Sequence, residues 1–166
     1  MLIRPATVRD AEALTDLHLD VWEEAYGHLI AEDILQGRRE SRSDRIERWS
    51  QNIPRPESQT LLAWDDDQRR LLGFISTGPG RDEPQPDLPD LEVWALYARA
   101  EVYGQGVGYA LLNEAIGTAQ AYLWVLDGND RAVGFYQRQG FRFDGSSKVE
   151  PVGVERRMVR QRVTVN

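Results

Sequence analysis

Residues 91–126 constrain the fold more than any other segment of the sequence. Leu91–Ala98 (LEVWALYA) has the apolar, aromatic and β-branched composition of a buried strand, and Tyr122–Leu126 (YLWVL) has it too. Between them lies a glycine-rich loop, followed by a helical pattern from about Val107 to Gly117. Because parallel neighbours need a crossover of this kind, the order strand, helix, strand predicts two parallel strands in one sheet.

The flanking segments favour antiparallel strands and further helices. Thr60–Trp64 and Leu71–Thr77 flank the Asp65-Asp66-Asp67 turn and predict a hairpin. Other predicted elements are a strand at 2–4, a helix after a capping box at Thr7–Asp10, one or two helices within 28–51, a helix from Asn129 to before Gly140, and strands near 141–148 and 153–163. We therefore predict one domain over residues 1–166, with a mixed α/β (α+β) fold.

Cysteine and histidine usage excludes several kinds of site. The chain of 166 residues has no cysteine, which excludes a thiol nucleophile, a disulfide and a thiolate metal site. His18 and His28 are the only histidines, and we interpret them as packing or surface groups, so no metal site is expected. The N-terminus lacks an apolar signal segment, and no apolar run reaches the ~20 residues of a membrane span. We expect a cytoplasmic protein without membrane contact.

The charge balance bears on the partners of the protein. The net charge is −7 and the pI is near 4.9, which disfavours nucleic acid and favours a cationic or amine partner. A polyphosphate would have to be bound by local groups rather than by the overall field.

The loop EVYGQGVGYALL is suited to a phosphate. Gly104, Gly106 and Gly108 leave backbone N–H groups accessible just before a helix N-terminus. The dinucleotide-binding pattern G-x-G-x-x-G is not matched: its sixth position is Tyr109 when counted from Gly104 and Leu111 when counted from Gly106. Asp127 does lie about 20 residues further on, where such sites have a ribose-binding acid. No P-loop lysine motif and no G-x-S-x-G motif occur.

Four motifs in order resemble the GNAT superfamily of N-acetyltransferases. Tyr103–Gly108 is similar to its Arg/Gln-x-x-Gly-x-Gly/Ala signature, and the preceding EVWALYARAEVYG is similar to its fourth strand. The second signature is matched by NDRA at 129–132, by Phe135-Tyr136 and by Gly140-Phe141, and the opening IRPAT also fits. The chain departs from the pattern at Tyr103, where Arg or Gln is usual, and in the short link from Gly117 to Ala121.

The resemblance implies a single N-acetyltransferase domain that uses acetyl-CoA (coenzyme A) without a metal. It implies a mainly antiparallel sheet, splayed parallel strands four and five, and helices on both faces. The acceptor is expected to be a primary amine of a small molecule or a peptide. Two alternatives stay open: a CoA-binding sensor without turnover and an NAD(P)-binding oxidoreductase. A homodimer is also possible, with an edge supplied by the C-terminal VERRMVRQRV.

The resemblance also implies which residues bind the cofactor. The backbone of Leu96, Tyr97 and Ala98 would pair with the pantetheine arm and polarise the acetyl carbonyl. The pyrophosphate would lie on the loop. Loop and nearby residues assigned to the cofactor are Tyr103, Gly104, Gln105, Gly106, Val107, Gly108, Tyr109, Asn129 and Phe135, although Asn129 also suits a plain helix N-cap.

Glu92 and Tyr136 are the catalytic candidates that the resemblance implies. Glu92 would deprotonate the amine, and period-2 alternation places it on the face of Trp94 and Leu96; its alternative role is a solvated strand-end carboxylate. Tyr136 would protonate the leaving thiolate, and its alternative role is a core aromatic.

Aromatic residues of the first helix and the fourth strand are candidates for the acceptor pocket. They are Trp22, Tyr26, Trp49 and Trp94, although such a stripe is also typical of a core. The arginines at 38–48 are interpreted as a solvated face, with a contact to the CoA 3′-phosphate as the alternative.

Overall fold

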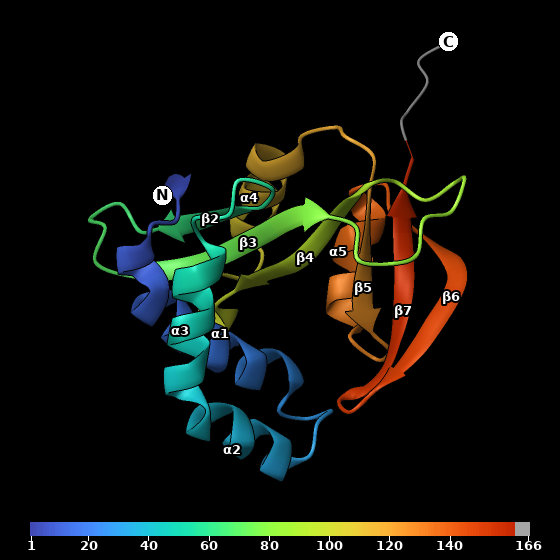
Figure 1. Ribbon diagram of the computed structural model, residues 1–166. Helices are drawn as coiled ribbons and strands as arrows, with labels where there is room; N and C mark the ends of the chain where they lie inside the picture. The colour runs from blue at the N-terminus through green and yellow to red at the C-terminus, as the bar shows by residue number, and fades with distance from the viewer. Residues whose placement is uncertain (162–166) are drawn as a thin grey trace.

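The computed structural model describes residues 1–161 and contains a seven-stranded sheet (Figure 1). The strand order is β1-β2-β3-β4-β5-β7-β6, and every neighbouring pair except β4–β5 is antiparallel. The strands are β1 Leu2–Pro5, β2 Gln59–Trp64, β3 Leu71–Pro79, β4 Leu91–Ala98, β5 Ala121–Leu126, β6 Arg142–Glu150 and β7 Gly153–Arg160. The predicted mixed fold, with one parallel pair, is confirmed.

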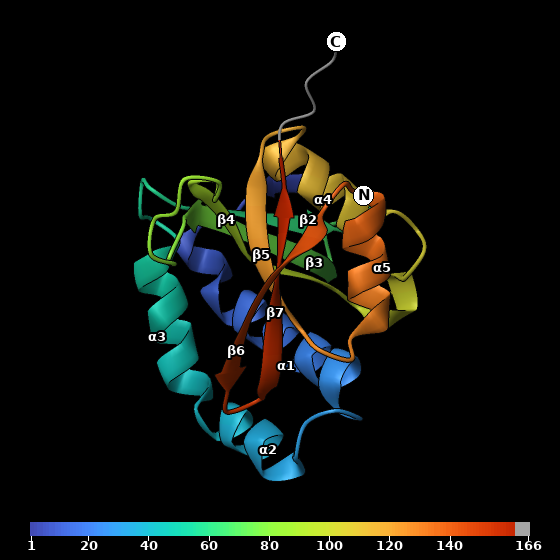
Figure 2. The same ribbon diagram turned by 90° about the vertical axis from the view of Figure 1, so that its right-hand side faces the viewer.

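Helices cover both faces of the sheet, as Figures 1 and 2 show. They are α1 Ala11–Tyr26, α2 Glu32–Glu40, α3 Arg42–Asn52, α4 Val107–Ile116 and α5 Asp130–Arg138, with short 3₁₀ turns η1 Val8–Asp10 and η2 Ala100–Val102. The apolar residues of α1 and α3 pack on one face, and those of α4 and α5 pack on the other. Among residues 1–161, no helix combines the length and apolarity that a membrane crossing requires.

The two faces of the sheet each carry a hydrophobic cluster. On one face Leu14 and Leu17 of α1 pack against Leu62 and Phe74. On the other face Leu111 of α4 packs into a cluster built from the alternate strand positions, such as Leu61 and Ile75. Full burial of a side chain of this size contributes ~1.5–3 kcal/mol, so the two clusters fix the helices to the sheet.

The predicted capping box at Thr7–Asp10 is confirmed and is reinforced by Arg4. Arg4 donates to both carboxylate oxygens of Asp10 at 2.8 and 2.7 Å, and the backbone N–H of Thr7 donates at 2.8 Å. The hydrogen bonds from Arg4, followed by those from Thr7, lower the pKa of Asp10 from 3.8 to about 2. This group ties β1 to the start of α1.

A bulge in β4 changes the direction of its side chains. Ser76 pairs with Ala95 and Thr77 pairs with Val93, so Trp94 is an extra residue in β4. Beyond the bulge Leu96 packs in the α4 cluster. The expectation that Glu92 shares a face with Leu96 is therefore wrong, because the extra residue inverts the period-2 alternation.

The parallel strands separate soon after they pair. The register of β4 with β5 contains only Glu92 opposite Tyr122 and Val93 opposite Leu123. The predicted splay of strands four and five is present, and it leaves the β5 side of the later β4 backbone without a paired strand.

The C-terminal strand lies inside the sheet and not at its edge. β7 pairs with β5, for example Arg157 opposite Trp124, and also with β6, for example Arg156 opposite Ser147. The expectation that VERRMVRQRV supplies a free edge is wrong for 154–160, because β6 folds back along the outer side of β7. The predicted end of that strand at 163 lies outside the described residues.

Candidate functional site

A cavity of about 340 Å³ lies between the glycine loop, the end of β4 and α5. We call it the loop cavity. Its lining includes Leu96, Tyr97, Ala98, Tyr103, Gly104, Gly106, Val107, Gly108, Tyr109, Arg131, Ala132, Phe135, Tyr136, Arg138 and Gln139. Every residue predicted to bind the cofactor lines this cavity except Gln105 and Asn129. The amide Nε2 of Gln105 instead donates to the carbonyl of Glu101 at 2.9 Å, so it closes the preceding turn.

Backbone conformation explains the glycines at 104 and 106. Their φ angles are +77° and +86°, in the left-handed region that favours glycine, although a Cβ at either position would meet no atom within 4 Å. Gly106 directly precedes α4, whose first-turn N–H groups have no partner within the helix. Those N–H groups and the positive end of the helix dipole suit an anion in the loop cavity.

Two arginines of α5 bring positive charge to the loop cavity. Arg131 and Arg138 share a helix face with Phe135, and all three line the cavity. The Arg131 guanidinium lies 3.5 Å from the centroid of the Tyr103 ring. Arg131 and Arg138 are not among the site residues that the sequence predicts; their i, i+4, i+7 spacing around Phe135 is the signal that could have indicated them.

A small junction cavity of about 50 Å³ opens where β4 and β5 separate. It is lined by residues of both strands, together with Asn129 and Tyr136, and Tyr136 also lines the loop cavity. Burial raises the pKa of the Tyr136 hydroxyl, so it stays protonated at neutral pH. The Asn129 Oδ1 accepts a hydrogen bond from the Ala132 N–H at 3.3 Å, so Asn129 is an N-cap that also borders the junction cavity.

The acceptor candidates gather around a third space of about 100 Å³, the aromatic cavity. Trp22, Tyr26 and Trp94 line it, as does Trp124. Its polar lining residues are Arg81, Glu92, Lys148 and Glu155. The sequence does not predict four of these lining residues, namely Arg81, Trp124, Lys148 and Glu155. They come from the 80–90 loop, β5, β6 and β7, and only the fold brings these segments together.

Trp49 lies apart from the aromatic cavity. It packs edge-on against His18 and Phe74, at ring-centroid distances of 6.0 and 5.6 Å. The expectation that Trp49 lines the acceptor pocket is therefore wrong, because α3 turns this ring into the core on the α1 face. His18 is a packing group as expected, and His28 is an exposed one.

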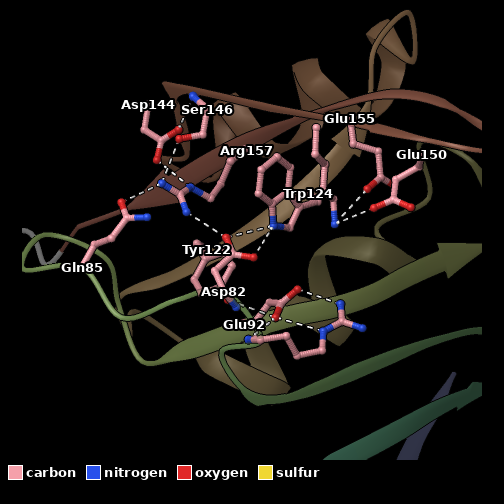
Figure 3. A network of polar contacts seen from close by, with 12 residues as sticks. Asp82, Gln85, Glu92, Tyr122, Trp124, Asp144, Ser146, Glu150, Glu155 and Arg157 are labelled. Carbon is pink, nitrogen blue, oxygen red and sulfur yellow. Dashed lines mark hydrogen bonds and ion pairs between the residues drawn. The ribbon is translucent and has the colours of Figure 1, made fainter.

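Glu92 is a buried carboxylate with several donors around it (Figure 3). Its side chain is 1% exposed, which excludes the solvated strand-end alternative. Arg81 donates from Nη2 to Oε1 at 2.7 Å and from its backbone N–H to Oε2 at 2.9 Å. The Tyr122 hydroxyl donates to Oε2 at 3.1 Å. Oε2 therefore receives most of the hydrogen bonds, and Oε1 is the less occupied oxygen.

A second ion-pair group holds the 80–90 loop on the sheet (Figure 3). Arg157, which is 4% exposed, bonds Asp82 at 2.8 Å and Asp144 at 2.7 Å. Asp82 also accepts from the indole N–H of Trp124 at 3.2 Å, and its backbone N–H donates to Tyr122 at 3.0 Å. These partly buried polar contacts thus hold the 80–90 loop beside the aromatic cavity.

The arginines at 38–48 are only partly a solvated face. Arg39 and Arg42 pair with acids of α1, with Arg42 Nε at 2.6 Å from Asp16. Arg38 is partly buried and its guanidinium lies 3.5 Å from the ring centroid of Trp22. The interpretation of Arg38 as solvated is wrong, because stacking on Trp22 removes it from water. Among residues 1–161, no three His, Asp or Glu side chains gather as metal ligands.

Residues 12–141 match the model of the acetyltransferase (GNAT) family. The chain belongs to this family. The N-acetyltransferase YuaI of Bacillus subtilis is 26% identical over 141 residues, which cover 81% of this chain and 76% of YuaI. The peptidyl-lysine N-acetyltransferase YjaB of Salmonella typhimurium is 38% identical over 99 residues, covering 59% of this chain and 60% of YjaB.

Solved structures share the GNAT fold of this chain. The PaiA N-acetyltransferase of Thermoplasma acidophilum, solved with coenzyme A, is 23% identical with a TM-score of 0.68, covering 94% of this chain and 96% of that one. A protein of Corynebacterium glutamicum titled histone acetyltransferase HPA2 and related acetyltransferase is 20% identical with a TM-score of 0.72, covering 98% and 97%. The protein is an N-acetyltransferase, so the oxidoreductase alternative is wrong.

Proposed function

We propose that this GNAT enzyme transfers an acetyl group from acetyl-CoA directly to a primary amine of a small molecule or peptide. The observation that carries the proposal is the continuity of the three cavities. Leu96 and Tyr136 line both the loop and the junction cavities, and Trp94 and Trp124 line both the junction and the aromatic cavities. Two substrates that enter from opposite sides would meet at the splay between β4 and β5.

The loop cavity is the proposed site of acetyl-CoA. Its volume of about 340 Å³ falls within the usual range of small-molecule sites. The backbone from Gly104 to Tyr109 would hold the pyrophosphate, with Arg131 beside it, and the free edge of Leu96–Ala98 would pair with the pantetheine arm. The coenzyme A found in the related PaiA structure supports this choice.

The aromatic cavity is the proposed site of the acceptor. Five aromatic residues line a space of about 100 Å³, which suits an ammonium group held by cation–π attraction. The negative net charge of −7 also favours a cationic acceptor. The peptidyl-lysine activity in the name of the Salmonella relative supports an aliphatic amine of the lysine kind.

The proposed chemistry needs a base, an oxyanion donor and an acid. An amine of the lysine kind has a pKa of about 10.4, so a base must remove its proton, and Glu92 would do so through Oε1 directly or through water. A backbone N–H of β4 would stabilise the oxyanion. The protonated Tyr136 hydroxyl would donate to the departing thiolate, whose pKa is about 8.5 if it resembles a cysteine thiol.

Ligand-induced stabilisation tests the cofactor assignment. We expect acetyl-CoA and CoA to raise the melting temperature, because a hundredfold excess over Kd stabilises a protein by ~2.7 kcal/mol, and we expect NAD and NADP to leave it unchanged. A shift with NAD alone, or no shift with acetyl-CoA, would contradict the proposal.

A further inference from the structure

The chain has a single lysine, and that lysine lies in the aromatic cavity. Of the 20 lysine and arginine residues, only Lys148 is a lysine. It lies on β6, lines the aromatic cavity, and holds its Nζ 4.5 Å from the ring centroid of Trp124. The ammonium group therefore occupies the kind of position that the proposed function gives to the acceptor amine.

We propose that Lys148 is an autoacetylation site, whose ε-amino group accepts an acetyl group within the active site of its own chain. This inference rests on the proposed function, because it uses the same acetyl donor and the same catalytic groups. It goes beyond that function in naming an acceptor that the protein itself carries.

Lys148 lines the aromatic cavity, which shares wall residues with the junction cavity. Trp124, over which the ammonium lies, also lines the junction cavity, and Tyr136 connects that cavity to the loop cavity. β6 is an edge strand, and the Lys148 side chain is 37% exposed. The lysine side chain has a flexible four-carbon stem, so rotation about its bonds can move Nζ from the Trp124 ring toward the junction cavity.

Acids beside Lys148 can receive its proton. Nζ lies 3.3 Å from Oε2 of Glu155, its partner in the β6–β7 register, and 3.6 Å from Oε1 of Glu150. Glu155 and Glu150 are labelled at this end of the network in Figure 3. Glu155 also lines the aromatic cavity, together with Glu92.

The proposed step balances without an oxidant or a reductant. The Lys148 ammonium gives one proton to Glu155 or to water, and its nitrogen lone pair forms a C–N bond with the acetyl carbon. The C–S bond of the thioester breaks, and the sulfur leaves as a thiolate that takes a proton from Tyr136. The newly acylated nitrogen then gives up its second proton, which restores the Tyr136 hydroxyl. The products are an acetylated lysine, free CoA thiol and one released proton. Acetylation removes the positive charge of Lys148 and leaves the cavity more acidic.

Intact-protein mass spectrometry tests the proposal. The purified chain is incubated with acetyl-CoA and no added amine, and peptide mapping then locates any modification. We expect one added acetyl group, located on Lys148, at a rate that does not depend on protein concentration. Lys148→Arg keeps the charge but removes the nucleophile, so we expect this variant to gain no acetyl group under the same conditions.

A matched variant separates catalysis from simple chemical reactivity. The double variant Lys148→Arg and Arg55→Lys moves the only lysine to an exposed position outside the cavities. We expect this relocated lysine to be acetylated at least tenfold more slowly than Lys148. Equal rates at the two positions would overturn the proposal. No acetylation of Lys148, while an added amine is acetylated normally, would overturn it and leave the proposed function standing. Loss of both reactions would overturn both.

Discussion

Tyr103 and Arg131 form a stacked pair at the mouth of the loop cavity. Tyr103 stands where the GNAT signature has Arg or Gln, and the Arg131 guanidinium lies 3.5 Å from its ring centroid. Arginine stacks well on aromatic rings and keeps donors free at its rim. Arg131 of α5 therefore places a positive charge beside position 103, with the Tyr103 ring as the surface on which its guanidinium lies.

Removal of the Arg131 charge should weaken acetyl-CoA binding. We expect Arg131→Gln to raise the Kd for acetyl-CoA about tenfold, or ~1.4 kcal/mol, because one charge-assisted contact to phosphate is lost. Calorimetric titration measures this effect. Arg69→Gln, at the exposed β2–β3 turn, is the matched control and should bind as the original chain does. Equal Kd values for the two variants would contradict the role of Arg131.

The Tyr136 hydroxyl should matter for turnover more than for binding. Tyr136→Phe keeps the ring that packs against Phe135 and Phe141 but removes the proton donor. We expect kcat to fall roughly 10²-fold, with the Kd for acetyl-CoA changed less than about threefold. Steady-state kinetics and titration together measure the difference. Full turnover in this variant would remove Tyr136 from the mechanism.

Glu92 and Arg81 form an ion pair, and we expect the two residues to have different roles. Glu92→Gln and Arg81→Gln both break the 2.7 Å contact, but only the first removes the proposed base. We expect Glu92→Gln to lower kcat/KM roughly 10²-fold, mainly at low pH, and Arg81→Gln, which keeps the carboxylate, to have a smaller effect. Equal losses with the original pH profile in both variants would give Glu92 a structural role only.

The bulge in β4 changes which cavity the side chains of this strand line. With Trp94 as the extra residue, Glu92 and Trp94 line the aromatic cavity, whereas Leu96 lines the loop cavity. The strand leaves β5 after Val93, so the same segment also frees its backbone for a ligand. One inserted residue thus sets the direction of a buried carboxylate, an aromatic wall and an unpaired strand edge.

α1 carries a histidine that makes stability depend on pH. His18 packs among Trp49, Phe74 and Tyr97, and burial, with smaller effects of Arg38 and Arg45, lowers its pKa from 6.5 to about 3. Below pH 6.5 the His18 side chain therefore binds a proton in the unfolded chain but stays neutral in the folded chain. Protonation of the unfolded chain lowers the free energy of unfolding progressively as the pH falls from 6.5 toward 3.

His18→Phe keeps a ring at this position and removes the titration. We expect urea unfolding at about pH 7 and about pH 5 to show a larger loss of stability in the original chain than in the variant. Asp10 does not confuse this comparison, because its pKa shift from 3.8 to about 2 acts at lower pH. An identical pH dependence in both chains would contradict the burial of a neutral His18.

At the scale of the whole molecule, local sequence signals predicted the elements but not their distant contacts. The strand–helix–strand unit, the Thr7–Asp10 box and the glycine loop depend on neighbouring residues, and each lies where it was predicted. The Arg157–Asp82 pair joins residues 75 positions apart, and it depends on β7 lying beside β5. The local sequence around Arg157 or around Asp82 does not indicate that β7 lies beside β5.

The same limit applies to the site. The resemblance predicted the glycine-loop and β4 residues that line the loop cavity, because they come from one continuous unit, but it did not predict Arg131 or Arg138 of the helix after it. The bulge at Trp94 is invisible in an alternating pattern, and the joining of Trp124, Lys148 and Glu155 requires the order of β5, β7 and β6. These features were therefore found only in the folded chain.

The charge of the molecule is unevenly distributed between its cavities. The net charge is −7, yet Arg131 and Arg138 line the loop cavity, which has no acidic residue among the described residues that line it. In the aromatic cavity two acids are balanced by two basic residues, Arg81 and Lys148. The local charge of the loop cavity therefore fits an anionic ligand in spite of the acidic net charge.

Release of CoA thiol from acetyl-CoA, measured across a panel of small and peptidyl primary amines, tests the central claim most directly. We predict thiol release above the rate without amine for at least one cationic amine, in equal amount with the acetylated amine found by mass spectrometry. Stabilisation by acetyl-CoA without thiol release for any amine would contradict the claim and would instead support a CoA-binding protein without turnover.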